Sequence, residues 1–149
     1  MSDRITIRKA TEGDVDTTCC LWVNMVKELA PANKPNRYVW KSLTRELICY
    51  RPEYRMFVAE ANQTVIGFVD GTIELDAATD RVRVSGRHFY IVPEQRKSPA
   101  AGMLYRKMIR EGKSLGADDI FFNTANGERP MWERHGYKVG SNAMMRRIT

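Results

Sequence analysis

Apolar residues recur along the chain with two different spacings. Alternation with polar residues is typical of strands, and spacings of three and four residues are typical of helices. The expected strands cover residues 5–8, 55–60, 64–74, 81–92, 120–122, 137–139 and 143–148. The expected helices cover residues 15–29, 38–49, 98–115 and 130–135. The order β-α-α-β-β-β-α-β-α-β-β predicts one mixed α+β domain over residues 1–149.

Residues with special backbone or hydrogen-bonding properties mark the ends of these elements. Thr11 and Asp14 have the spacing of a capping box at the start of the first helix. Asn62-Gln63 predicts a tight turn that joins two strands into a hairpin, and Ser85-Gly86 predicts a β-bulge. Gly116 suits the position just after a helix, so the helix at 98–115 should end there.

Two of the expected helices have a clear apolar face. In the helix at 38–49, Val39, Leu43 and Leu47 fall on one side and are expected to pack against the sheet. In the helix at 98–115, the corresponding residues are Ala101, Leu104, Tyr105, Met108 and Ile109.

The composition is that of an ordinary globular protein. Of the 149 residues, 43% are hydrophobic and 28% are charged, which argues against a disordered chain. The formal net charge of +6 raises the local concentration of anions. However, the basic residues are spread along the chain, and no helix-turn-helix, zinc-finger or RNP1 pattern is present. No nucleic-acid partner is therefore expected, and a basic nucleic-acid-binding domain stays only as an alternative.

Cysteine usage and apolar runs indicate the compartment. Cys19, Cys20 and Cys49 are odd in number and form no CxxC pair, which favours a reduced compartment and predicts no metal site. Residues 1–4 lack the apolar region of a secretory signal. No apolar run approaches the ~20 residues of a membrane span. We therefore expect a soluble cytoplasmic protein without a membrane partner.

The segment from residue 89 to 104 combines a strand, a short basic turn and a capped helix. Ser98 is expected to be the N-cap and Pro99 the first helical residue. The first N–H groups of such a helix lack partners within it and lie at the positive end of its dipole. Arg96 and Lys97 add positive charge there. Small residues that leave this backbone open are Ala100, Ala101 and Gly102. The pattern fits a pyrophosphate site or an ordinary helix start beside two solvated cations, and both interpretations stay open.

Several motifs in this part of the chain occur together. Val92-Pro93-Glu94-Gln95-Arg96 follows the long strand, a turn covers residues 98–101, and Leu115-Gly116-Ala117 ends the helix. Residues 123–137 contain an Asn-bearing turn, a short helix and Gly136-Tyr137. Together these segments resemble the core of the GNAT superfamily of N-acetyltransferases, and the element order of nearly the whole chain is similar to that of the family. The resemblance implies a GNAT-like mixed, mostly antiparallel sheet flanked by helices.

The resemblance also implies an enzyme that transfers an acetyl group from acetyl-CoA, as co-substrate, to a primary amine. The backbone that would hold the pantetheine arm, as an added strand does, is that of Tyr90, Ile91 and Val92. Arg96 matches the first residue of the family's pyrophosphate loop, and Ala101 matches its last. The N–H groups that would surround the pyrophosphate are those of Lys97, Ser98, Ala100 and Ala101. Asn126 matches the family's asparagine that contacts the cofactor arm.

Two residues depart from the family pattern. Pro99 stands where the loop has glycine, which removes one amide donor. Trp132 stands in the cofactor site where the family often has a tyrosine that acts as general acid. An indole N–H donates a hydrogen bond but is no usable acid near pH 7. These departures keep one alternative open, a GNAT-fold binding or regulatory module with weak or lost transferase activity.

The general base is not fixed by the sequence. Family members often use Glu or His on the long strand, but the corresponding positions hold Ser85 and Arg87. The candidates are therefore His88 in that strand and Glu74 at the end of the preceding one; a hydrogen-bonded strand histidine and a solvated glutamate are the alternatives. The acceptor, a small-molecule or peptide amine, is unidentified, and a homodimer stays open. Residues that either pack in the core or form the acceptor surface are Trp22, Met25, Tyr38, Trp40 and Tyr54.

Overall fold

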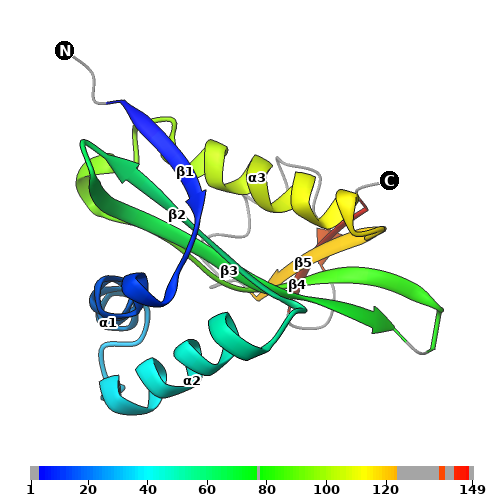
Figure 1. Cartoon of the computed structure of the whole chain (residues 1–149), viewed down its shortest axis with the longest axis horizontal. Helices are drawn as coiled ribbons and strands as arrows, with labels where there is room; N and C mark the ends of the chain where they lie inside the picture. The colour runs from blue at the N-terminus through cyan, green and yellow to red at the C-terminus, as the bar shows by residue number, and fades with distance from the viewer. Residues whose placement is uncertain (1–3, 77, 124–137, 140–142, 148–149) are drawn as a thin grey trace.

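The computed structural model describes residues 4–76, 78–123, 138–139 and 143–147 (Figure 1). The helices are α1 (Val15–Leu29), α2 (Arg37–Tyr50) and α3 (Ala100–Ser114). Two short 3₁₀ turns are η1 (Glu12–Asp14) and η2 (Pro93–Gln95). The strands are β1 (Ile5–Lys9), β2 (Tyr54–Ala61), β3 (Thr64–Asp76), β4 (Arg81–Ile91), β5 (Asp119–Asn123), β6 (Lys138–Val139) and β7 (Ala143–Arg147).

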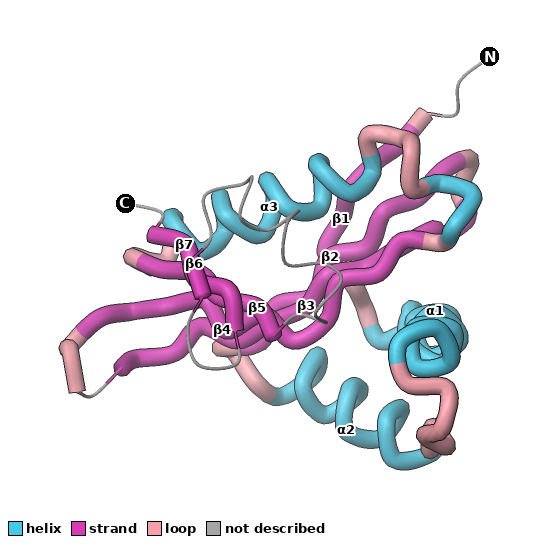
Figure 2. The backbone as a smooth tube through the Cα atoms, turned by 180° about the vertical axis from the view of Figure 1, so that it is seen from behind, coloured by secondary structure: helices cyan, strands magenta, loops and turns pink. Residues whose placement is uncertain are grey.

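The seven described strands form one sheet in the order β1-β2-β3-β4-β5-β7-β6. Strands β4 and β5 are parallel, and every other neighbouring pair is antiparallel. Helices α1 and α2 lie on one face of the sheet and α3 lies on the other (Figures 1 and 2). This architecture confirms the expected fold class. No helix among the described residues combines the length and apolarity that crossing a bilayer requires.

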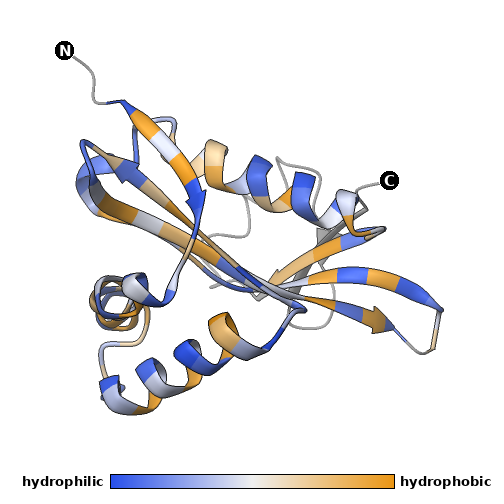
Figure 3. Ribbon diagram, in the orientation of Figure 1, coloured by the Kyte–Doolittle hydropathy of each residue, from blue (hydrophilic) through white to orange (hydrophobic). Residues whose placement is uncertain are grey.

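Two apolar clusters, one on each face, hold the helices to the sheet. On the α3 face, Leu104 and Met108 are fully buried in one cluster with Val69 of β3. On the α1–α2 face, Trp22 of α1 stacks on Trp40 of α2 with ring centroids 5.4 Å apart. Figure 3 shows apolar segments along the strands that the helices cover. The apolar area removed from water on both faces fixes where each helix lies.

The buried face of α2 differs from the one expected. Val39 and Leu43 are 56% and 43% exposed, and the buried residues are Trp40 and Thr44. Because the Trp40 ring carries more apolar surface than either aliphatic side chain, its packing between α1 and the sheet decides the rotation of the helix. The predicted face was therefore wrong for Val39 and Leu43, although Leu47 is half-buried.

The predicted capping box, hairpin turn and helix-ending glycine are confirmed. Thr11 and Asp14 form the capping box, in which the Thr11 N–H donates to Asp14 Oδ2 at 2.7 Å. Asn62 and Gln63 have φ values of 52° and 66°, as a two-residue hairpin turn with both central residues left-handed requires. Gly116, with φ of 83°, follows the end of α3.

Helix α3 begins one residue later than expected. Pro99 is the N-cap and Ala100 the first helical residue, so the assignment of Ser98 as N-cap was wrong. The Ser98 hydroxyl instead bridges the turn, since it donates to the Gln95 carbonyl at 2.7 Å and accepts from the Ala100 N–H at 3.3 Å. The helix expected at 130–135 lies outside the described residues.

Strands β4 and β5 run side by side over a short distance only. Their paired residues extend from Arg83 and Asp119 to Gly86 and Phe122. Strand β4 then continues to Ile91, and no described strand lies beside it on that side. The parallel pair therefore opens into a free strand edge.

The predicted β-bulge lies at this point of divergence. Asp70 pairs with His88 and Gly71 pairs with Gly86, so Arg87 is an extra residue in β4. A bulge of this kind bends the strand and re-aims the side chains next to it. The bulge therefore decides how the residues at the opening are presented.

Gly67 of β3 lies against the backbone of β4, so Gly67→Ala should destabilise the fold. An added Cβ would lie 2.6 Å from the Tyr90 carbonyl oxygen and 2.4 Å from Ile91 Cδ1, so the strands would have to separate. We expect the free energy of unfolding to fall by about 2 kcal/mol and the Tm by about 4–8 °C. Gly13→Ala is the control, because its Cβ would meet only Thr11 Oγ1 at 3.6 Å. Equal Tm values for the two variants would contradict this packing.

Candidate active site

A groove of about 320 Å³ follows the free edge of β4. Its lining comes from the end of α1, the end of β4 and the start of α3. Its lining residues are Met25, Glu28, Leu29, Phe89, Tyr90, Ile91, Arg96 and Ala101. Of the predicted cofactor residues, Tyr90, Ile91, Arg96 and Ala101 line this groove, and Val92 does not.

Some backbone amides at the start of α3 have no hydrogen-bond acceptor among the described residues. They are those of Lys97, Ala101 and Gly102. Unpaired N–H groups at a helix N-terminus attract anions, because the helix dipole adds to their partial charges. The opening turn of α3 can therefore receive an anionic group beside the groove.

Two other predicted amide donors are already used within the turn. The Ser98 N–H donates to the Gln95 carbonyl at 3.1 Å, and the Ala100 N–H donates to Ser98 Oγ. Pro99 has no N–H to donate. In this conformation the N–H groups available to a ligand are those of Lys97, Ala101 and Gly102, whereas the predicted donors Ser98 and Ala100 are occupied.

The Arg96 guanidinium is held across the mouth of the groove. Its Nε donates to the Ile91 carbonyl at 3.0 Å, and one terminal nitrogen donates to Glu28 Oε2 at 2.7 Å. The guanidinium carbon lies 5.5 Å from the centroid of the Tyr90 ring. The Tyr90 hydroxyl donates to Glu28 Oε1 at 2.9 Å. Glu28 of α1 thus accepts hydrogen bonds from both neighbours.

These contacts shift the pKa values of all three groups. Burial acts to raise the pKa of Glu28, but the hydrogen bonds from Arg96 and Tyr90 hold it below its usual value. Burial, followed by the hydrogen bond to Glu28, raises the pKa of Tyr90 to about 12. The hydrogen bond to Glu28 raises the pKa of Arg96. At neutral pH the groove therefore holds one carboxylate, one guanidinium and one protonated phenol.

A second polar group lies on the α1–α2 face beside the bulge. Asp70 of β3 is only 1% exposed. Its Oδ1 lies 2.8 Å from His88 Nδ1 of β4, and its Oδ2 accepts a hydrogen bond from the Tyr54 hydroxyl of β2. Three neighbouring strands thus place a tyrosine, a carboxylate and a histidine in one buried chain of hydrogen bonds.

The partners of Asp70 set the orientation of the His88 ring. Burial, followed by the Asp70 charge, raises the pKa of Tyr54 well above its usual value, so the phenol stays protonated and donates. Asp70 accepts at both oxygens, which places the hydrogen of a neutral His88 ring on Nδ1. The lone pair is then on Nε2, and this nitrogen can accept a proton.

Glu74, the second candidate for the general base, lies away from His88 and Asp70 on β3. Glu74 is exposed and accepts a hydrogen bond from Thr72 Oγ1 at 3.0 Å. It is four residues beyond Asp70 on β3, which corresponds to about 13 Å along a strand. The structure therefore does not bring Glu74 to His88. Asn126 and Trp132 lie outside the described residues.

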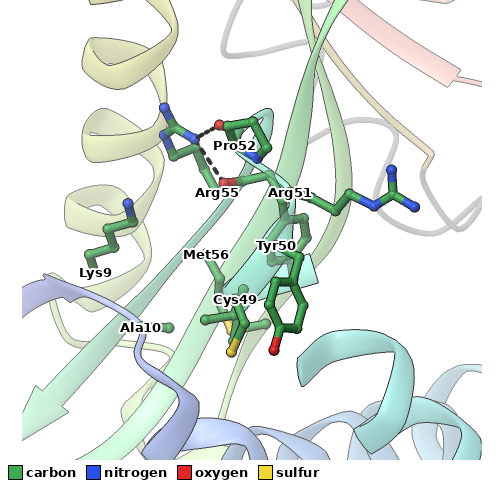
Figure 4. Close-up of a pocket in the computed structure, with 10 residues that line it drawn as sticks. Lys9, Ala10, Cys49, Tyr50, Arg51, Pro52, Arg55 and Met56 are labelled. Atoms are coloured by element: carbon green, nitrogen blue, oxygen red, sulfur yellow. Dashed lines mark hydrogen bonds between the residues drawn. The ribbon is translucent and has the colours of Figure 1, made fainter. Parts of the chain in front are cut away.

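A larger cleft of about 510 Å³ lies between the end of β1, the end of α2 and the start of β2 (Figure 4). Arg55 at its edge is engaged by the carbonyls of Pro52 and Tyr54 and by Glu111 at 3.0 Å. Cys49 is exposed there. The groove at β4 is the better candidate site, because it lies at the strand edge beside Arg96 and the unpaired amides of α3.

Sequence reasoning missed Asp70, Tyr54 and Glu28. A signal for Asp70 was present, because it is the first charged residue of the strand, directly follows the apolar residues 65–69 and lies on the same side as Phe68. Tyr54 was considered only as a core or acceptor-surface residue. Glu28 lies 68 residues from Arg96 in the chain, and its helix position alone predicts a solvated side chain.

Comparison with known proteins identifies the family to which this fold and groove belong. The model described as the Acetyltransferase (GNAT) family matches residues 22–137. The chain therefore belongs to the GNAT family of acetyltransferases, as the motifs between residues 89 and 137 implied.

Several solved structures are similar in fold. An N-acetyltransferase, PaiA, from Thermoplasma acidophilum in complex with coenzyme A has a TM-score of 0.72 and 17% identity over 99% of both chains. A predicted acetyltransferase with acetyl-CoA from Clostridium acetobutylicum has a TM-score of 0.79 and 14% identity, over 93% of this chain and 92% of that one. An aminoglycoside N-acetyltransferase in complex with CoA has a TM-score of 0.74 and 19% identity, over 91% and 86%. No curated protein matches the sequence.

Proposed function

We propose that residues 1–149 act as one acetyltransferase domain that moves the acetyl group of acetyl-CoA to a primary amine. The observation that carries this proposal is the free edge of β4, which opens directly beside Arg96 and the unpaired amides of α3. The family membership of the chain and the CoA complexes of similar structures support it.

The residues of the groove fit a cofactor with a long polar arm and a diphosphate. The edge of β4 at Tyr90 and Ile91, which no described strand pairs with, can pair with an extended arm that continues along Val92, as a further strand would. Arg96 and the amides of Lys97, Ala101 and Gly102 supply positive charge and donors for the diphosphate. We retain Asn126 and Trp132 as cofactor contacts on the basis of their motif positions.

Acetyl-CoA, when bound, supplies an activated thioester whose C–S bond breaks as the C–N bond of the amide forms, leaving a free thiol. We assign the general base to His88. Its Nε2 takes one proton from the attacking amine, and the Asp70 carboxylate stabilises the imidazolium that results. Tyr54 holds Asp70 in place by its hydrogen bond. The histidine then releases this proton to solvent, and the leaving thiolate takes up one proton from solvent, so the products are an amide and a free thiol.

Thiol release on a broad panel of amines, together with calorimetry of CoA binding, tests the proposed activity. An acetyltransferase binds CoA at micromolar concentration and releases thiol with at least one amine. The alternative, a binding or regulatory module, binds CoA without turnover on any amine. A protein that neither binds CoA nor releases thiol would overturn both.

Glu28→Gln should strengthen CoA binding. The Glu28 carboxylate occupies Arg96 and repels an incoming diphosphate, so removing its charge frees the guanidinium. Because the pair is solvent-exposed, we expect Kd to fall by about three- to tenfold. Isothermal titration calorimetry at low and high salt measures the effect, which should shrink as salt screens the charges.

The matched control for this prediction is Glu94→Gln. Glu94 is exposed, lies in the same turn as Arg96 and forms no ion pair with any described residue. Glu94→Gln removes the same formal charge as Glu28→Gln but leaves the Arg96–Glu28 pair intact. An equal change of Kd in both variants, or weaker binding by Glu28→Gln, would contradict the proposed competition.

A further inference from the structure

The bulge in β4 brings two functional side chains to one face of the sheet. Arg87 is the extra residue at the bulge, and His88 follows it. The Arg87 guanidinium carbon lies 5.9 Å from the centroid of the Tyr54 ring, whereas His88 Nδ1 lies 2.8 Å from Asp70. Tyr54 and Asp70 are hydrogen-bonded to each other. The Arg87 guanidinium and the His88 ring therefore both lie next to the buried Tyr54–Asp70 pair.

The positive charge of Arg87 has no acidic partner among the described residues. The nearby carboxylate of Asp70 already accepts from Tyr54 and His88. A guanidinium lying on an aromatic ring keeps its planar donor groups available for a carboxylate. Arg87 is therefore positioned to bind an anionic group that no described residue provides.

The elements on this face carry a small excess of positive charge. Residues 12–51 contain six basic and five acidic residues. Each of these acids is paired with a basic residue: Glu12 with Arg45, Asp14 with Arg8, Asp16 with Lys41, Glu28 with Arg96 and Glu46 with Arg51. Such a surface attracts anionic ligands and repels polycations.

Given the proposed function, we infer that the acceptor carries a carboxylate a few bonds from the amine that is acetylated. The amine lies at His88 Nε2, and the carboxylate binds Arg87. This geometry selects free amino acids and short acidic peptides over aminoglycosides and other polycationic amines. Arg87 determines specificity for the acceptor and takes no part in proton transfer.

The test compares acceptors that differ only in the carboxylate. The probes are glycine, β-alanine, L-aspartate and L-glutamate, their C-terminal amides, an amidated dipeptide that begins with aspartate, and kanamycin. We expect kcat/KM to be at least about tenfold higher for a free amino acid than for its amide. The amidated dipeptide distinguishes a side-chain carboxylate from the carboxylate of a free amino acid, and activity with either supports the inference. Equal or higher activity with amides or kanamycin overturns it.

Arg87→Gln links this preference to the residue. We expect the ratio of kcat/KM between carboxylate and amide acceptors to fall by about tenfold or more, whereas Arg87→Lys should restore part of it. The matched control is Lys107→Gln on the opposite face, where Lys107 lies 5.4 Å from the Phe57 ring and the same charge and ring contact are removed. An unchanged ratio in Arg87→Gln, with an unchanged Tm, overturns the role of Arg87.

A binding measurement separates this inference from the proposed function. Calorimetry of L-glutamate with the CoA-saturated protein should give binding that is weakened in Arg87→Gln. If CoA binds and kanamycin is acetylated, the proposed function holds and the inference fails. If CoA binds but no carboxylate compound binds or reacts, the inference also fails. If CoA itself does not bind, the proposed function fails.

Discussion

Arg96→Glu weakens CoA binding by about 100-fold or more. The substitution removes the guanidinium that faces the groove and places a second carboxylate next to Glu28. Charge-assisted hydrogen bonds to phosphate are among the stronger polar contacts in proteins, at roughly 1.5–3 kcal/mol each. Repulsion between the new carboxylate and the diphosphate adds to that loss. Isothermal titration calorimetry measures the change in Kd.

Arg110→Glu is the control for the charge reversal. Arg110 is exposed on α3, away from its N-terminus, and it makes no ion pair with another described residue. Its reversal changes the net charge by the same amount, so it should alter Kd only slightly at physiological salt. Similar losses in both variants would indicate a general charge effect and would remove Arg96 from the binding site.

His88→Gln lowers kcat by about 10²–10⁴-fold, the usual range for loss of a general base. Glutamine can still hydrogen-bond to Asp70, but it cannot accept the proton of the amine. Asp70→Asn should also lower kcat, because it removes the charge that stabilises the imidazolium and replaces one of the two accepting oxygens with a donor. Steady-state thiol release with saturating CoA measures both, and CoA binding by calorimetry should stay unchanged in His88→Gln.

Glu74→Gln is the matched control on the neighbouring strand. Glu74 is exposed and separated from Asp70 by four residues, so its neutralisation should change kcat less than twofold. A large loss in Glu74→Gln together with normal activity in His88→Gln would show that the base had been assigned to the wrong strand.

The cofactor side of the molecule could be predicted from sequence because its signals are local. The turn before α3, the bulge near Gly86 and the left-handed residues at 62, 63 and 116 each follow from the conformational limits of a few neighbouring residues. The start of α3 was misplaced because a serine can bridge a turn as readily as it can cap a helix.

The catalytic side was less predictable because it depends on contacts distant in sequence. His88 and Asp70 are 18 residues apart in the chain. They face each other only because the bulge inserts one extra residue, Arg87, which changes the side of the sheet on which the following residues lie. Similarly, the rotation of α2 depends on the contact between Trp40 and Trp22 of α1, and the spacing of apolar residues in α2 alone does not predict this contact. Sequence patterns define single elements well, whereas pairs of elements are defined by packing.

A crystal structure of the protein with CoA tests the central claim most directly. We expect the pantetheine arm to lie along the edge of β4 at Tyr90 and Ile91 and beside Val92. It also predicts diphosphate oxygens within about 3 Å of the Lys97 and Ala101 amides, with the Arg96 guanidinium turned from Glu28 to the diphosphate. CoA bound in another cleft, such as the one at Cys49, with the Arg96–Glu28 pair intact, would contradict it.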